Sequence, residues 1–319
     1  MVTFGVFLEP EALTFAEIKR FCLEAENLGY TSLSCNDHLQ PFSPDPSRPQ
    51  QECWLTLAAL ADATSKIRLG PLCTSVSYRN PALVAKMAAT LDAISNGRFE
   101  LGIGAGWNKP EFDAYGIPFP PIGERLQRLR EAVAIIGRMW TQEKATWNGR
   151  FYYVHQAYNS PKPVQEPAPP IIVGATGDLT LRTAGEIGDG VNIHAHRIRP
   201  GIPPYATPED IKRKLSIVEE GARSAGKDYS TFKKSMLTGV VISKKKDESA
   251  DWIRRHSKER GMTPEEYVKW SFNGTPDDCI EKIKGFVDAG IDHFALLFPE
   301  PKSLSGIRLF AEEVMVQFE

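Results

Sequence analysis

Residues 171–178 read IIVGATGD, and this short stretch indicates the fold of the whole chain. The apolar, β-branched run at 171–173 is typical of a buried strand. The small residues at 174–177 form a tight turn, and Asp178 opens a helical pattern directly after it. A strand that turns at once into a helix is the repeating unit of a parallel α/β sheet.

The same alternation of apolar runs and helical patterns continues along nearly the whole chain. Eight runs have the composition of buried strands, at residues 4–8, 33–36, 67–76, 99–102, 171–173, 191–194, 236–242 and 294–298. Eight consecutive βα units fit a closed (β/α)₈ cylinder, the TIM barrel. We therefore predict an α/β fold of this class, formed by residues 1–319 as a single domain.

Several predicted helices carry clear start signals. Thr14 followed by Glu17 forms a capping box, in which each side chain bonds the backbone N–H of the other residue. Thr207, Thr263 and Thr275 are each followed by proline and then by acidic residues, which are favoured in the first turn of a helix.

Two connections are longer than usual and are predicted as insertions, one after the fourth helix and one after the seventh strand. In the first, Asn148-Gly149 predicts a type I′ hairpin turn, because both residues tolerate the positive φ angles of that turn. The second, residues 243–274, is rich in Lys and Glu and is expected to form surface helices.

Composition excludes several classes of function. With 38 basic and 40 acidic residues the net charge is -2, so no basic field is available for nucleic acid or for an anionic membrane. No apolar run reaches the roughly 18 residues of a membrane span, and residues 1–15 lack the basic start of a signal peptide, so a cytoplasmic location is expected. The five scattered cysteines indicate neither disulfides nor a thiolate zinc site.

Active sites of such barrels lie at the carboxyl ends of the strands. His38 follows the second run and can exchange a proton near neutral pH, and its neighbour Asp37 is a candidate to orient it. The turn at 174–177 brings backbone N–H groups and a helix start toward a possible anion, although steric need for glycine explains it equally. The glycines between 102 and 106 lack the dinucleotide G-x-G-x-x-G spacing.

Two further groups follow the sixth run. His194 and His196 suggest a metal site, and a metal-dependent hydrolase built from these two with Asp37 and His38 is one alternative function, although no spaced ligand motif accompanies them. Arg197, Arg199 and Lys109 are candidates for a basic rim that would hold an anionic ligand tail, or are simply solvated surface charges.

Four ordered blocks carry a family resemblance. They are NDHLQPF at 36–42, RLGPLCT at 68–74 with YRNP at 78–81, LDAISNGR at 91–98, and LGIGAGWN at 101–108 running on to YGIPFP at 115–120 and ER at 124–125. Together they resemble the bacterial luciferase-like superfamily, and within it the oxidoreductases that use the 5-deazaflavin coenzyme F420. The resemblance extends over roughly residues 1 to 300.

The resemblance implies that the deazaflavin ring lies in the carboxyl-end mouth of the barrel, over a bulge with a cis peptide at Leu72–Cys73. His38 matches the histidine that handles the substrate's proton. Trp107 stands where related sugar-phosphate dehydrogenases carry glutamate, and Phe42 where they carry tryptophan, so a different substrate is expected. Strand-end position and the resemblance together select these cofactor contacts: Asp37, Leu72, Cys73, Thr74, Gly104, Ala105, Gly106, Trp107, Gly174, Ala175, Thr176, Gly177 and His194.

The function predicted from the sequence is hydride transfer between coenzyme F420 and an unidentified small organic substrate, without a metal. An FMN-dependent monooxygenase on the same barrel and a non-catalytic deazaflavin carrier stay open as alternatives. The resemblance also implies a homodimer.

Overall fold

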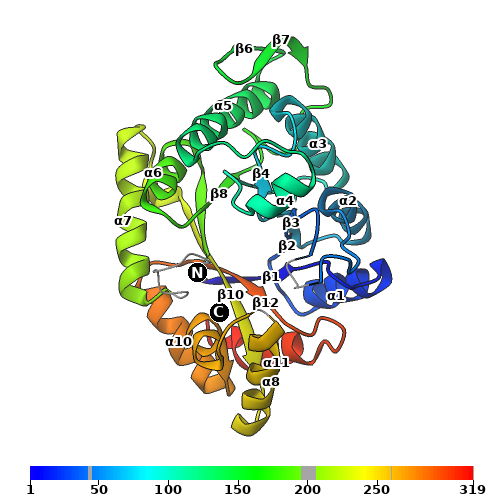
Figure 1. The fold of residues 1–319 in the computed structure, drawn as a ribbon, viewed down its shortest axis with the longest axis vertical. Coiled ribbons are helices and arrows are strands. Elements are labelled where there is room, and N and C mark those ends of the chain that lie inside the picture. The colour runs from blue at the N-terminus through cyan, green and yellow to red at the C-terminus, as the bar shows by residue number, and fades with distance from the viewer. Residues whose placement is uncertain (42–44, 195–205, 260, 319) are drawn as a thin grey trace.

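The computed structural model describes residues 1–41, 45–194, 206–259 and 261–318. Parallel strands form a barrel that helices surround (Figure 1). The strands of the barrel are β1 (Thr3–Leu8), β2 (Ser32–Cys35), β3 (Arg68–Pro71), β4 (Thr74–Ser75), β5 (Leu101–Gly104), β8 (Ile171–Ala175), β9 (Gly190–His194), β10 (Lys233–Ile242) and β12 (His293–Leu297).

Neighbouring strands follow the order β3-β2-β1-β12-β10-β9-β8-β5-β4. The barrel closes between β3 and the segment that leads into β5, because Leu69 of β3 pairs in parallel with Phe99. The amide N of Glu100 donates to the Leu69 carbonyl at 2.9 Å, and the amide N of Leu69 to the Arg98 carbonyl at 2.9 Å. The predicted (β/α)₈ barrel is thus confirmed.

One predicted strand is divided into two. The run at 67–76 forms β3 and β4, with the peptide bond between Leu72 and Cys73 in the cis configuration between them. This cis bond was predicted at these two residues and is confirmed. After the interruption, β4 pairs with β5 (Thr74 opposite Ile103), so β3 and β4 share the third position of the eightfold barrel.

The helices begin where the capping signals predicted. Thr14 closes the capping box of α1, and Thr207, Thr263 and Thr275 are the N-caps of α7, α9 and α10. The helices are α1 (Phe15–Asn27), α2 (Cys53–Ala63), α3 (Pro81–Ile94), α4 (Lys109–Ala114), α5 (Ile122–Thr141), α6 (Asp178–Ile187), α7 (Pro208–Ser224), α8 (Lys246–Glu259), α9 (Pro264–Trp270), α10 (Pro276–Asp288) and α11 (Ser305–Glu313), with 3₁₀ turns η1 (Tyr229–Thr231) and η2 (Met315–Gln317).

The first insertion is the hairpin of β6 (Lys144–Asn148) and β7 (Tyr153–Tyr158), which projects beyond α5 (Figure 1). The hairpin was predicted, but the type I′ turn was wrong, because neither Asn148 nor Gly149 has a positive φ angle. The loop is longer, and the Glu131 carboxylate of α5 accepts the backbone N–H groups of residues 150, 151 and 152 at 3.0, 3.1 and 3.2 Å. The conformation of this loop is therefore set by the contact with Glu131 and not by a local two-residue turn.

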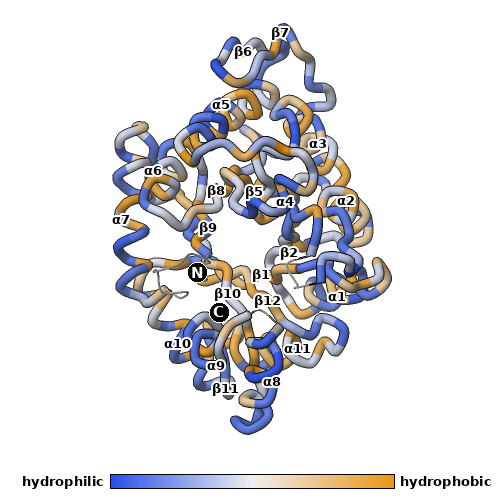
Figure 2. Tube along the Cα trace, viewed as in Figure 1, coloured by the Kyte–Doolittle hydropathy of each residue, from blue (hydrophilic) through white to orange (hydrophobic). Residues whose placement is uncertain are grey.

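The second insertion, predicted at 243–274, contains α8, α9 and the short strand β11 (Phe272–Gly274), which pairs with β10. Figure 2 shows α8 as mostly hydrophilic, whereas β1 and β10 carry hydrophobic residues. Aromatic rings of neighbouring strands pack together; Phe294 of β12 lies 5.7 Å from Phe4 of β1 and 5.6 Å from Phe272 of β11, centroid to centroid. Within the described ranges, no helix is long and apolar enough to cross a membrane.

Candidate active site

Three elements bring polar side chains together at the carboxyl end of the barrel. His38 follows β2, Tyr78 follows β4, and Glu111 lies in the short helix α4 after β5. The Glu111 carboxylate is fully buried, whereas the His38 side chain is 15% exposed. The site therefore contains a buried carboxylate behind a histidine that reaches the surface of the mouth.

Glu111 is surrounded by hydrogen-bond donors. Its Oε2 lies 2.8 Å from His38 Nδ1 and accepts the Tyr78 hydroxyl at 2.5 Å. Its Oε1 accepts the backbone N–H groups of Leu39 at 2.5 Å and Gln40 at 3.3 Å. Burial alone would raise the pKa of Glu111, but the hydrogen bonds from His38, Tyr78 and Leu39 outweigh it, and the pKa is lowered. Glu111 is therefore held as a carboxylate.

Asp37 does not contact His38 in the way predicted for an orienting residue. Its two oxygens receive a bidentate contact from the Arg79 guanidinium at 2.5 and 3.0 Å, and Thr74 donates its hydroxyl at 2.5 Å. Burial raises the pKa of Asp37, and Arg79 opposes this rise. The orienting role expected of Asp37 is thus corrected: Arg79 and Thr74 engage this carboxylate, and Glu111 is the carboxylate at the histidine.

Trp107 forms the wall beside His38. The two rings meet edge to face, with centroids 5.9 Å apart. The Trp107 side chain is 48% exposed, which is unusual for so large an apolar group. A half-exposed indole beside an imidazole provides an apolar surface for a ligand in the mouth.

The floor of the mouth is formed where β4, β5 and β8 approach closely around Cys73. A Cβ atom added at Gly174 would lie 2.6 Å from Cys73 Sγ, and one at Gly104 would lie 3.7 Å from Cys73 Cβ. Burial raises the pKa of Cys73 to about 12, so the thiol stays protonated and unreactive at neutral pH. Cys73 thus lies in close contact with both Gly104 and Gly174.

Arg125 of α5 binds the loop that follows β5. The guanidinium donates to the carbonyls of Ala105, at 3.4 Å, and Gly106. Because C=O and N–H point in opposite directions across a trans peptide, the N–H groups of Gly106 and Trp107 face away from Arg125. Gly106 has φ of +77°, and a Cβ there would lie 2.6 Å from Ser75 Oγ, so only glycine fits. Adjacent N–H groups of this kind suit an anion.

The second predicted anion contact is arranged differently. The N–H groups of Thr176 and Gly177 donate to the Thr180 hydroxyl at 3.2 and 3.0 Å, so the first turn of α6 already satisfies them.

The other predicted site residues are placed as follows. His194 is the last residue of β9. Lys109 forms an ion pair with Asp113 at 2.5 Å. The predicted positions Phe42, His196, Arg197 and Arg199 lie outside the described residues.

Sequence reasoning gave no site role to Glu111, nor to Tyr78, Arg79 and Arg125, which it noted only within the blocks of the family resemblance. Asn108 and Glu111 are spaced like the capping box of α4, which would predict a solvated helix start. In the structure Asn108 makes no side-chain cap, and Glu111 points inward. The only signal for its role was an acidic residue in the loop region after a strand, where the site was expected.

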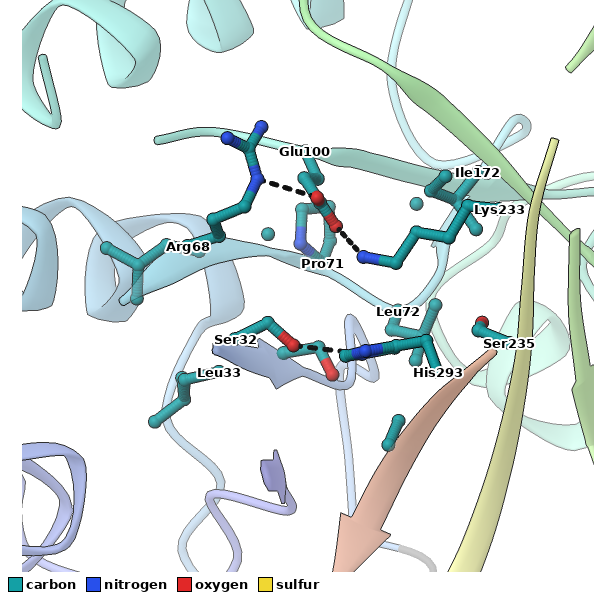
Figure 3. Close-up of a pocket in the computed structure, with 15 residues that line it drawn as sticks. Ser32, Leu33, Arg68, Pro71, Leu72, Glu100, Ile172, Lys233, Ser235 and His293 are labelled. Atoms are coloured by element: carbon teal, nitrogen blue, oxygen red, sulfur yellow. Dashed lines mark hydrogen bonds and ion pairs between the residues drawn. The ribbon is translucent and has the colours of Figure 1, made fainter. Parts of the chain in front are cut away.

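A second polar cluster lies at the opposite, amino-terminal end of the barrel (Figure 3). Arg68 Nε and Lys233 Nζ approach the two oxygens of Glu100 at 2.6 and 2.7 Å. Below them, His293 contacts Ser32 Oγ through Nε2 at 3.1 Å and Thr3 Oγ1 through Nδ1 at 2.8 Å. The space between is about 30 Å³, room for little more than water. Among the described residues, no three His, Cys, Asp or Glu side chains are grouped to hold a metal ion.

Comparison with known proteins agrees with this geometry. Residues 2–269 match the model of the luciferase-like monooxygenase family. F420-dependent glucose-6-phosphate dehydrogenase of Intrasporangium calvum is 30% identical, covering 94% of this chain and 93% of its own. The enzyme of the same name from Kineococcus radiotolerans is also 30% identical, covering 98% and 95%.

Solved structures resemble the whole chain. An F420-dependent secondary alcohol dehydrogenase in complex with an F420-acetone adduct superimposes with a TM-score of 0.85 at 25% identity, covering 98% of both chains. The coenzyme F420-dependent tetrahydromethanopterin reductase of Methanopyrus kandleri gives a TM-score of 0.81 at 25% identity, covering 100% and 99%.

Proposed function

This chain belongs to the luciferase-like monooxygenase family, and from that premise we propose that it is an F420-dependent oxidoreductase that interconverts a small alcohol and its carbonyl compound. Its relatives at 30% identity carry F420-dependent dehydrogenase names. The observation that carries the reaction type is His38 at the carboxyl end of the barrel, with Nδ1 2.8 Å from the Glu111 carboxylate.

The residues of the mouth fit the coenzyme. Gly104 and Gly174 have no side chain beside Cys73, so a flat ring could approach the backbone closely there. The loop of Ala105 and Gly106, held by Arg125, suits the phosphate. When bound, F420 accepts or donates a hydride at the carbon that replaces the reactive flavin nitrogen.

The protein's part in the reaction is to move the accompanying proton. Oxidation of an alcohol releases a hydride from carbon and a proton from oxygen, and a base within hydrogen-bond reach of that oxygen is required. His38 supplies this base, and Trp107 supplies an apolar wall 5.9 Å from it. An indole in place of a carboxylate or hydroxyl favours a small, weakly polar alcohol over a sugar phosphate.

The experiment that tests the proposal is a pair of titrations of the purified protein, one with F420 and one with FMN, followed by the quenching of cofactor fluorescence. We expect the protein to bind F420, and we expect FMN not to compete with F420 for the site. Incubation of the F420 complex with short secondary alcohols should then bleach the absorbance of the oxidised coenzyme. Tight FMN binding with oxygen consumption would instead indicate the monooxygenase alternative, and F420 binding without hydride exchange would indicate a carrier.

Homodimerisation stays a prediction of the family resemblance. Light scattering on the purified chain would give its mass directly, with twice 35.5 kDa expected.

A further inference from the structure

We infer that Glu111 is the positioning residue of this site: it fixes His38 in the tautomer that carries its proton on Nδ1, so that Nε2 is the nitrogen that acts as base. The inference rests on the proposed function for its catalytic meaning, but the tautomer itself is a property of the protein alone.

The hydrogen-bond inventory around Glu111 requires this tautomer. A carboxylate accepts and does not donate, so the 2.8 Å contact between Glu111 Oε2 and His38 Nδ1 needs a proton on Nδ1. A neutral imidazole has a single N–H, and its other nitrogen, Nε2, then carries the acceptor lone pair. The orientation of the ring and the identity of the basic nitrogen are therefore set by one contact.

Glu111 is itself fixed from several directions. Five donors converge on its two oxygens, namely His38 Nδ1, the Tyr78 hydroxyl, the backbone N–H groups of Leu39 and Gln40 and, at 3.5 Å, the Asn108 side-chain amide. Two of the donors are main-chain groups of the segment that carries His38, so the carboxylate holds both the ring and the backbone next to it. Full burial of Glu111 excludes competing water.

This arrangement has a direct chemical consequence. In alcohol oxidation the O–H proton passes to His38 Nε2, the C–H hydride passes to the oxidised coenzyme, and the carbonyl compound is released. The imidazole then carries a positive charge 2.8 Å from the buried Glu111 carboxylate, which stabilises that charge. In the reverse direction the same proton returns from Nε2 to the carbonyl oxygen.

Replacing Glu111 by glutamine should invert the tautomer. A glutamine has one acceptor oxygen and one N–H₂ donor, and the N–H groups of Leu39 and Gln40 require the oxygen on their side. The amide N–H₂ then faces His38 Nδ1, which must become an acceptor, and the ring proton moves to Nε2. The base is lost although the shape of the side chain is unchanged.

The experiment uses ¹⁵N-histidine-labelled protein and the Glu111→Gln variant. Imidazole ¹⁵N shifts distinguish the two tautomers, and the His38 signal is assigned from a His38→Asn spectrum. We expect the Nδ1–H form in the wild type and the Nε2–H form in the variant. We also expect kcat to fall about 100-fold or more, while the dissociation constant for F420 changes less than about threefold.

The matched control is Glu131→Gln. Like Glu111, Glu131 accepts backbone N–H groups of a loop, in this case three of them. It lies in α5 under the β6–β7 hairpin, away from His38. This variant should keep both the tautomer and kcat. A glutamine at 131 that lowered kcat equally would show a general loss of fold and overturn the inference.

The outcomes separate this inference from the proposed function. An Nε2–H tautomer in the wild type, or an Nδ1–H tautomer in the Glu111→Gln protein, overturns the positioning role, and the wild-type spectrum decides this even if the variant does not fold. Failure of the wild type to bind or reduce F420 overturns the proposed function and leaves the measured tautomer standing.

Discussion

The two ends of the barrel each hold a histidine in a polar cluster, but the surroundings of the two rings differ. At the amino-terminal end, both nitrogens of His293 contact neutral hydroxyls, those of Ser32 and Thr3 (Figure 3). At the carboxyl end, Nδ1 of His38 contacts the carboxylate of Glu111. One ring is held between alcohols, and the other is backed by a negative charge.

This difference determines what each histidine can do. Burial and the nearby charge of Lys233 lower the pKa of His293 to about 3, so this ring stays neutral under all physiological conditions. His38 instead has a carboxylate placed to stabilise the charge that it acquires with a proton. The comparison teaches that the partner of the second nitrogen, and not the histidine alone, separates a structural site from a candidate catalytic one.

The largest expected effect separates the two histidines directly. His38→Asn should lower kcat for the F420-dependent reaction about 100-fold or more, because the general base is removed, with little change in thermal stability. His293→Asn should keep kcat and lower the stability, because Ser32 and Thr3 lose their buried partner. Stopped-flow reduction of the coenzyme and calorimetric melting measure both. A His38→Asn enzyme with normal turnover would remove the distinction.

The next effect tests the ion cluster of the amino-terminal end. Burial opposes ionisation of Glu100, but the charges of Lys233 and Arg68 outweigh it and lower the pKa of Glu100 to about 2. The folded-state pKa lies below the unfolded value near 4.5, so the stabilisation is complete above that pH and is lost as the pH falls toward 2. We expect Glu100→Gln to cost about 2–3 kcal/mol at pH 7.

The pH dependence gives this prediction its control. Urea unfolding should show the wild type losing stability between pH 4.5 and 2, and the Glu100→Gln protein losing much less over the same interval. His293 adds a separate loss that begins at its unfolded pKa near 6.5 and continues toward 3, in both proteins. Parallel curves for the two proteins below pH 4.5 would contradict the assignment to Glu100.

The contrast between the ends also shows what the sequence could predict. Strand runs and capping signals are local, so the barrel, the helix starts at Thr14 and Thr275 and both insertions were predicted from short windows. The turn at Asn148–Gly149 was predicted wrongly because Glu131, which binds the N–H groups of residues 19 and 20 positions later, decides that geometry. Long-range contacts of this kind leave no local signal.

The site was predicted in the same uneven way. His38 and the Leu72–Cys73 cis bond came from position and resemblance, whereas Glu111 and Arg79 act through contacts across 73 and 42 residues of sequence. Asp37 was chosen as the orienting carboxylate because it is adjacent to His38 in sequence. In the structure Asp37 instead pairs with Arg79, and the histidine takes its carboxylate partner from α4.

A smaller effect compares a glycine at each end. A Cβ at Gly174 would lie 2.6 Å from Cys73 Sγ at the carboxyl end, and one at Gly5 would lie 2.0 Å from Ser32 Oγ at the other. Both Gly→Ala variants should lose about 1–3 kcal/mol of stability through overpacking. Gly174→Ala alone should weaken F420 binding, since it displaces the floor of the mouth. Equal F420 affinity in the two variants, measured by fluorescence titration, would show that Gly174 does not support the coenzyme.

The smallest effect is expected when one hydroxyl is removed from the hydrogen-bond network around each of the two histidines. Tyr78→Phe leaves Glu111 with its contacts to His38 and to the Leu39 and Gln40 amides, so we expect kcat to fall only about threefold to tenfold. Ser32→Ala leaves Nε2 of His293 without its hydroxyl partner and should cost about 1 kcal/mol of stability at unchanged kcat. The pair is measured by turnover and by urea unfolding side by side. If Ser32→Ala slowed turnover as much as Tyr78→Phe, the two ends of the barrel would be coupled, and the division between a structural and a catalytic histidine would fail.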